Sequence, residues 1–96
     1  SNIQCLESNL RKVIFTLSEN REIEVVGKLT DYEEFLLHHG FCRCHKSYLV
    51  NMAYIQRIKS TGVWLNDDTK LPISARNYKY LRQEYLHWKG MKRWRM

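Results

Sequence analysis

The stretch Phe-Cys-Arg-Cys-His-Lys, residues 41–46, holds the densest set of reactive side chains in this 96-residue sequence. Two thiols, an imidazole and two cations follow one another without a gap. Such a set could hold a metal, supply a thiol nucleophile, or present cations to an anionic partner. In a β-strand alternate residues share a face, so Cys42 and Cys44 are expected on one face and His45 on the other.

A metal site or a catalytic thiol fits this spacing poorly. A structural zinc site needs four ligands, commonly supplied as paired cysteines or histidines, and no second pair with that spacing exists. The remaining candidate ligands are Cys5, His38, His39 and His87. A catalytic cysteine needs a lowered pKa and a partner base, which strand alternation keeps apart. We therefore interpret Cys42 and Cys44 as small core residues, and we predict no metal and no cofactor.

Other motifs of enzyme chemistry are equally weak. The paired carboxylates are Glu33-Glu34 and Asp67-Asp68, and adjacent acids of this kind are usually solvated. The four glycines are isolated, so no phosphate-binding loop is present. The sequence therefore predicts a protein that is not an enzyme.

The composition indicates one small globular domain. The chain is 44% hydrophobic and 12% aromatic and has a single proline, which excludes a disordered chain. No apolar run is long enough for a transmembrane helix, and no signal peptide is visible, so we expect a cytoplasmic protein with free thiols. We expect residues 1–2 to be a cloning remnant, residues 3–88 the domain, and residues 89–96 a basic tail.

Positive charge is concentrated at the carboxyl-terminal end. Residues 1–70 contain nine basic and nine acidic residues, whereas residues 71–96 contain seven basic residues and only Glu84, which accounts for the net charge of +6. A concentrated basic region suits a polyanion, because neutralised phosphates release counterions. The alternative is a solvated basic helix.

The sequence pattern predicts mainly β-structure with short peripheral helices. Strands are expected over residues 3–7, 12–17, 22–26, 41–48, 55–58, 63–65 and 70–73. A first helix over 30–38 has a capping box in Thr30 and Glu33, an apolar side that includes Phe35, and Gly40 after its end. A second helix over 75–88 is expected to be capped by Ser74, to include Leu86 in its apolar repeat and to be stopped by Gly90.

Several cations are expected at the ends of these elements, where side chains can project. Arg11 and Lys12 fall at a loop–strand junction, Lys46 precedes a turn, and Arg76 and Asn77 begin the last helix. Arg and Asn are the types that make bidentate contacts to guanine and adenine. Lys79 and the tail cations would suit phosphates. Any single one of them is also consistent with an ordinary solvated charge.

The segment FCRCHKSYLVNMAYI resembles the LytTR-type DNA-binding domain of bacterial response regulators. The motif positions are Phe41, Arg43, His45, Lys46, Ser47, Tyr48, Leu49, Val50, Asn51 and Ile55. Two flanking segments agree with the resemblance, Gly27-Lys28-Leu29 and Leu71-Pro72-Ile73-Ser74-Ala75-Arg76. The resemblance spans about residues 3–87.

This resemblance implies an elongated β-sandwich-like fold that reads double-stranded DNA through loops, enters major grooves and bends the duplex. Carried over to this sequence, the contacting positions are Arg11 or Lys12, then Lys46, then Arg76. The motif residues Phe41, Arg43, His45, Ser47 and Asn51 would be scaffold.

The resemblance also implies a setting for the domain. Family members usually carry an amino-terminal receiver domain, so the chain is expected to be an effector domain from a longer parent or a stand-alone member. We expect a weak monomer that pairs on repeated promoter sites.

Two alternatives remain open from the sequence. A single-stranded nucleic-acid binder would stack bases on Trp64, Tyr48 and Trp94. A protein-interaction module would present the basic helix to an acidic partner and prefer no DNA sequence.

Overall fold

The computed structural model describes residues 2–94 of the chain, and side chains within residues 2–91. Eight strands and two α-helices follow one another along this part of the chain. They are β1 (Ile3–Asn9), β2 (Lys12–Leu17), β3 (Glu22–Val26), α1 (Thr30–Leu37), β4 (Phe41–His45), β5 (Tyr48–Asn51), β6 (Ile55–Lys59), β7 (Gly62–Leu65), β8 (Lys70–Leu71) and α2 (Ala75–Trp94). Short 3-10 turns at Ser18–Asn20 and Met52–Tyr54 complete the path. None of the described helices is long and apolar enough to cross a membrane.

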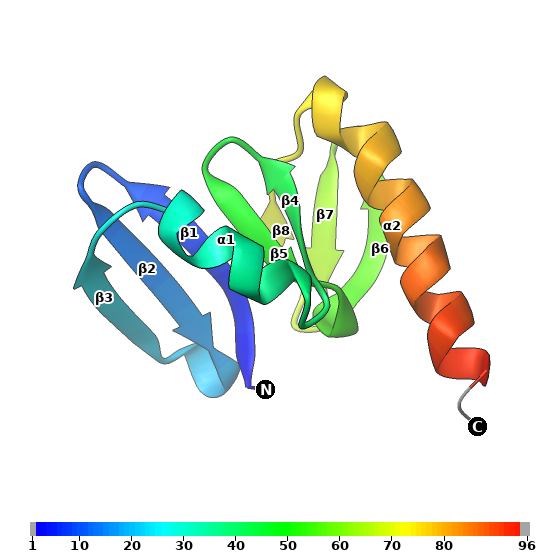
Figure 1. The fold of residues 1–96 in the computed structure, drawn as a ribbon, viewed down its shortest axis with the longest axis horizontal. Coiled ribbons are helices and arrows are strands. Elements are labelled where there is room, and N and C mark those ends of the chain that lie inside the picture. The colour runs from blue at the N-terminus through cyan, green and yellow to red at the C-terminus, as the bar shows by residue number, and fades with distance from the viewer. Residues whose placement is uncertain (1, 95–96) are drawn as a thin grey trace.

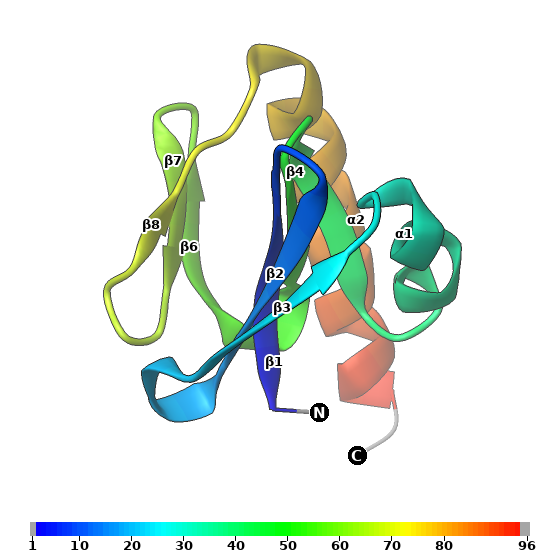
Figure 2. The same ribbon diagram turned by 90° about the vertical axis from the view of Figure 1, so that its left-hand side faces the viewer.

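The strands form two antiparallel sheets. The larger sheet has the order β3-β2-β1-β5-β4, and the smaller has the order β6-β7-β8. Figures 1 and 2 show α1 lying over one face of the larger sheet, while α2 runs beside β4 and β6. The predicted fold class, mainly β with helices at the periphery, is confirmed.

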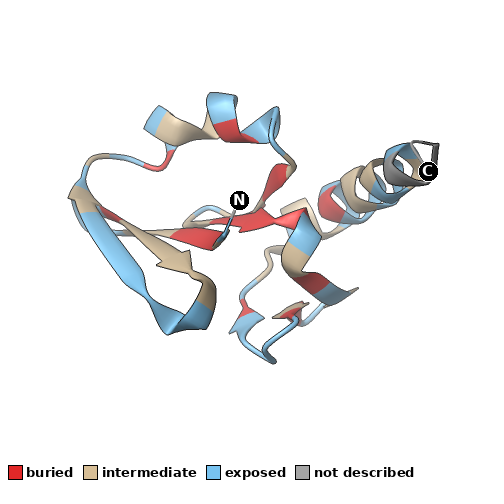
Figure 3. Cartoon of the chain, turned by 90° about the horizontal axis from the view of Figure 1, so that it is seen from below, coloured by how far each residue is buried: buried red, intermediate tan, exposed pale blue. Residues whose placement is uncertain are grey.

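Alternate residues of the central strands point to two separate cores. On one face of the larger sheet Leu6 and Leu49 pack with Leu36 of α1. On the other face Val50 packs with Val63 of β7 and Leu81 of α2. The molecule is therefore layered, with the larger sheet buried on both sides near its middle. Figure 3 shows the buried positions gathered there and the exposed ones on β3 and along much of α2.

The cap of α1 and the exposure of Phe35 differ from the prediction, although the bounds of the helix agree with it to within one residue. The helix begins at Thr30, and Leu29 occupies the capping position without a side-chain cap. Asp31 Oδ2 instead accepts a hydrogen bond from the backbone N–H of Lys28 at 2.9 Å. The predicted capping box is wrong because Glu33 is engaged elsewhere, by Arg43 of β4. Phe35, expected on the buried side, is 66% exposed and stacks on His39.

The later elements show four further differences. The segment 41–48 is interrupted by a turn at residues 46–47 that separates β4 from β5, and β8 is only two residues long. Helix α2 continues through Gly90 to Trp94, six residues beyond the predicted end. A glycine inside a helix costs only about 1 kcal/mol relative to alanine, which the surrounding helix-forming residues offset. Leu86, counted in the predicted apolar repeat, is 65% exposed.

Candidate nucleic-acid interface

Three turns meet at one edge of the molecule. They are the β1–β2 turn, the β4–β5 turn and the segment that joins β8 to α2, and Figures 1 and 2 show them spaced along the upper side of the molecule. Backbone hydrogen bonds link each of these segments to a strand or turn beside it. The N–H of Ser8 donates to the carbonyl of Ser47 at 2.8 Å, and the N–H of Ser74 donates to the carbonyl of Cys44 at 3.1 Å. We call this surface the three-turn edge.

The β4–β5 turn is held in shape by two side chains of β4. Arg43 Nη1 donates to the carbonyl oxygen of Lys46 at 2.6 Å. The Nδ1 atom of His45 accepts from the N–H of Ser47 at 3.1 Å. Both bonds satisfy backbone groups within the turn, so the Lys46 side chain starts from a fixed backbone.

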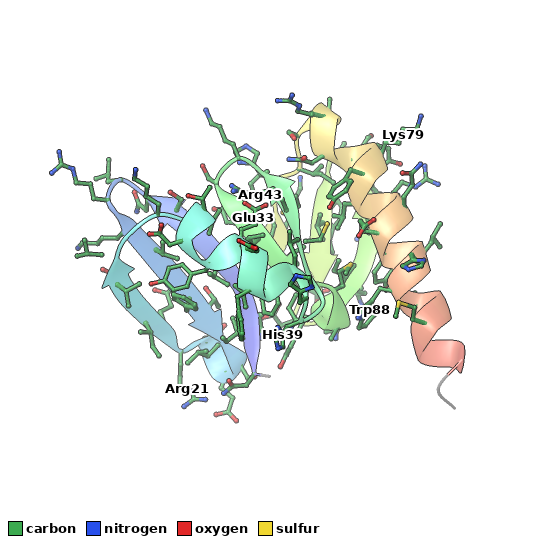
Figure 4. All side chains as sticks on the ribbon, viewed as in Figure 1. Arg21, Glu33, His39, Arg43, Lys79 and Trp88 are labelled. Atoms are coloured by element: carbon green, nitrogen blue, oxygen red, sulfur yellow. The ribbon has the colours of Figure 1, made fainter. Side chains whose placement is uncertain are left out.

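Arg43 is itself anchored by α1. Its Nη2 and Nε atoms donate to the two carboxylate oxygens of Glu33 at 2.5 and 3.3 Å. The two side chains are 18% and 25% exposed, and Figure 4 shows them meeting between α1 and β4. A bidentate contact of this kind fixes the orientation of the guanidinium relative to the carboxylate. The helix thus positions the turn through one arginine.

Two further motif residues lie in the interior. Phe41 is 2% exposed and packs in the core under α1. Asn51 is 5% exposed, and its side chain makes two hydrogen bonds to the backbone at the end of β5. Its Oδ1 accepts from the N–H of Ala53 at 3.0 Å, and its Nδ2 donates to the carbonyl of Ile3 at 2.8 Å. This residue therefore joins β1 to the chain that leaves β5.

Ser74 caps α2, as the sequence predicted. The N–H of Asn77 donates to Ser74 Oγ at 3.1 Å, and Tyr78 N–H donates to the Ser74 carbonyl at 3.0 Å. This cap fixes the direction in which Arg76 leaves the first turn of the helix.

A depression of about 480 Å³ separates the β4–β5 turn from the start of α2. Its lining residues are Arg43, His45, Lys46, Ser74, Arg76 and Asn77. The fold thus brings together two of the three positions that the resemblance indicates as DNA contacts, Lys46 and Arg76. Both side chains are exposed and make no hydrogen bond or ion pair to any described residue. Lys79 is also exposed, and in Figure 4 it projects outward from α2.

The third predicted position lies on the β1–β2 turn. Asn9 pairs with Lys12, so the turn consists of Leu10 and Arg11. The Lys12 ammonium lies 3.4 Å from the carboxylate of Glu24 on β3. The Arg11 side chain is exposed and has no partner among residues 2–91. Of the two cations that the sequence left open, Arg11 is the more available.

The three cysteines are buried thiols. Cys5, Cys42 and Cys44 are at most 4% exposed and form no disulfide. Burial raises the pKa of the Cys5 thiol to about 11, and it raises the pKa of Cys42 and of Cys44 to about 12. A thiol with a raised pKa is a poor nucleophile at neutral pH. Within the described residues, His, Cys, Asp and Glu form no group that could hold a metal.

The aromatic residues offered as base-stacking platforms are engaged with other side chains. The Trp64 ring lies 4.7 Å from Arg57 Cζ and 5.2 Å from Lys70 Nζ, in cation–π contacts across the smaller sheet. Tyr48 packs against the core, and its pKa is raised to about 12 by burial and by the charge of Glu7. The side chain of Trp94 lies outside the described residues, as do those of the last tail cations.

Comparisons of the sequence and the fold with known proteins identify the family of this chain. The sequence matches the model of the LytTr DNA-binding domain over residues 1–85. The chain belongs to the LytTr DNA-binding domain family. A solved structure from Bacillus cereus, described as the LytTr DNA-binding domain of a methyl-accepting/DNA response regulator, has the same fold with a TM-score of 0.75. The alignment has 23% identity and covers 86% of this chain and 80% of the other. No curated protein matches the sequence.

Proposed function

We propose that this LytTr domain binds double-stranded DNA sequence-specifically, as the effector domain of a bacterial transcriptional regulator of the two-component type. The observation that carries the proposal is the three-turn edge. Three turns far apart in sequence lie along one edge, where backbone hydrogen bonds link their flanking strands, and each turn presents a cation that no other described residue neutralises. If these cations served the fold, we would expect carboxylates of the protein beside them. In a complex with DNA, phosphates and base edges would be their partners.

The contacts divide into base contacts and phosphate contacts. Arg11, Lys46 and Arg76 extend from the three turns and would reach base edges in successive major grooves. Lys12 and Lys79 lie beside them and would contact phosphates. The family resemblance also supports a bent duplex in the complex, a deformation whose energy depends on the DNA sequence.

Asn77 has a separate role in this scheme. It lies half-buried beside Arg76 in the same depression, and its amide would pair with an adenine edge.

The proposed setting is a longer regulator. A receiver domain in the parent chain would drive two copies onto repeated promoter sites. Alone, one domain reads a short site and would bind weakly as a monomer, because few base contacts must offset the entropy of association.

The test begins with selection of duplexes from a random pool, followed by a salt titration of the enriched duplex. We expect a recurring sequence and an affinity that falls steeply with salt. Lys46→Ala and Arg76→Ala should each weaken binding to that duplex by about 1–3 kcal/mol, or roughly five- to 150-fold.

Arg21→Ala is the matched control. It removes one exposed cation from the end of the molecule opposite the three-turn edge, as Figure 4 shows. If all three variants bind equally well, the residue assignment is wrong. Salt-sensitive binding without sequence enrichment would mean that the cations contact phosphates only, and stronger binding to single strands would favour a stacking surface.

A further inference from the structure

Leu10 occupies an unusual position at the tip of the β1–β2 turn. Its side chain is 95% exposed, the highest value among the large exposed hydrophobic residues of the described chain. Its φ angle is +61°, in the left-handed region. The residue is the first of the two in the turn, and the second, Arg11, does not share the positive φ.

A leucine is an unfavourable choice for this position. Two-residue hairpin turns with a positive φ at the first turn residue favour glycine, since a Cβ atom is strained there. The other non-glycine residues with positive φ in the described chain are Glu19, Asn20 and Asp68. Leu10 is the apolar exception among them. It also gains almost nothing from packing, because its side chain lies in solvent.

The surroundings of Leu10 are those of the proposed DNA contact surface. Arg11 follows it directly, and Ser8, two residues before it on β1, is hydrogen-bonded to Ser47 beside Lys46. An apolar tip among cations has no role in gripping phosphates. In a DNA groove, however, one base carries an apolar group at its edge, the C5-methyl of thymine in the major groove.

We propose that Leu10 is a specificity-determining residue that packs against thymine methyl groups in the major groove. The inference rests on the proposed function, and it adds an apolar contact to the hydrogen-bonding contacts of Arg11, Lys46 and Arg76. The positive φ of Leu10 places its side chain outward at the tip of the turn. From there the side chain would enter the major groove, while the strands behind it stay outside the groove.

The test uses Leu10→Gly with the duplex enriched by selection. Glycine relieves the strain of the positive φ, so the thermal midpoint should stay unchanged or rise. Affinity should fall about tenfold, somewhat less than for a fully buried leucine, because the side chain would be only partly covered in the groove. Leu86→Ala is the matched control: it removes an exposed leucine from α2, far from the three-turn edge, and should bind as the parent does.

Deoxyuridine substitution locates the partner. Each thymine of the duplex is replaced in turn by deoxyuridine, which lacks only the methyl group. At one or two positions the loss of the methyl should weaken binding of the parent domain several-fold and leave Leu10→Gly unaffected. Such non-additivity is the signature of direct contact.

Three results would overturn the inference. Leu10→Gly could bind as tightly as the parent, no deoxyuridine position could weaken the parent, or the two losses could simply add. The first two, with Arg76→Ala still impaired, would leave the proposed function standing. If the parent domain enriches no duplex at all, the proposed function fails, and this inference fails with it.

Discussion

Arg43 joins three parts of the molecule through one side chain. It lies on β4, and its guanidinium donates hydrogen bonds to Glu33 of α1 and to the carbonyl of Lys46 in the β4–β5 turn. A lysine could keep the charge but not the planar set of donors that makes these three contacts together. The arginine therefore fixes the shape of the turn, and the proposed DNA contact is made by Lys46.

The variant Arg43→Lys separates these two roles. Loss of the paired contact to Glu33 and of the bond to the turn should lower the free energy of unfolding by about 1–3 kcal/mol. Affinity for the selected duplex should also fall, about tenfold, although the net charge is unchanged. Urea unfolding and a binding titration measure the two effects. Arg21→Lys is the control, and equal affinity of both variants would show that the turn keeps its shape without Arg43.

At the scale of the elements, the sequence predicted what depends on local pattern. The strands 12–17 and 22–26 have the predicted bounds, because alternation and β-branched residues act within one strand. The capping box at Thr30 was wrong because Glu33 bonds a residue ten positions away, which local spacing does not reveal. Gly90 was wrong as a stop signal, since its cost is small within a long helix.

The candidate site shows the same division between local and long-range information. The motif predicted Lys46 and Arg76 as a set of contacts but not their meeting across one depression, which depends on the hydrogen bond from Ser74 to Cys44. Leu10 was missed altogether. Its signal was an apolar residue between Asn9 and Arg11, but the strand was expected to end at residue 7, so a two-residue turn at Leu10 and Arg11 was not recognised.

The cap of α2 offers a prediction in which stability and affinity diverge. Ser74→Ala removes the oxygen that accepts from the N–H of Asn77, and should lower the free energy of unfolding by about 1 kcal/mol. Ser74→Asp restores the cap and favours the helix dipole, so stability should return to the parental value. It also places a negative charge in the depression between Lys46 and Arg76, so DNA affinity should fall below that of Ser74→Ala.

Chemical denaturation and binding titrations measure both quantities. Ser60→Ala, in the exposed turn between β6 and β7, serves as the control. If Ser74→Asp bound DNA as well as the parent, the depression would not face phosphates or bases.

At the scale of the whole molecule, stability comes from a larger sheet whose central strands are buried on both faces. Adjacent residues of β5, Leu49 and Val50, belong to the two different cores, and the same is true of Phe41 and Cys42 on β4. Neither core can be lost without exposing the central strands. We therefore infer that the described chain unfolds as one unit, and that buried groups in either core influence the stability of the whole.

The buried thiols make that stability depend on alkaline pH. Burial raises the pKa of Cys44 in the folded protein from 9.0 to about 12. Below pH 9 the thiol is protonated in both states and pH has no effect through it. Above pH 9 the unfolded chain releases the proton while the folded chain retains it, so stability falls as pH rises from 9 towards 12. For one thiol the loss between pH 7.5 and pH 10 is about 1.4 kcal/mol.

The variant Cys44→Ala isolates this contribution from the tyrosines and lysines that titrate in the same range. It should be less stable than the parent at pH 7.5, because a buried sulfur is removed. Between pH 7.5 and pH 10 it should lose about 1.4 kcal/mol less than the parent does, since the other titrating groups are common to both proteins. Urea unfolding at the two pH values gives the comparison. Equal losses would mean that the thiol ionises in the folded protein as it does in the unfolded chain, and the core around Cys44 would then have to admit water.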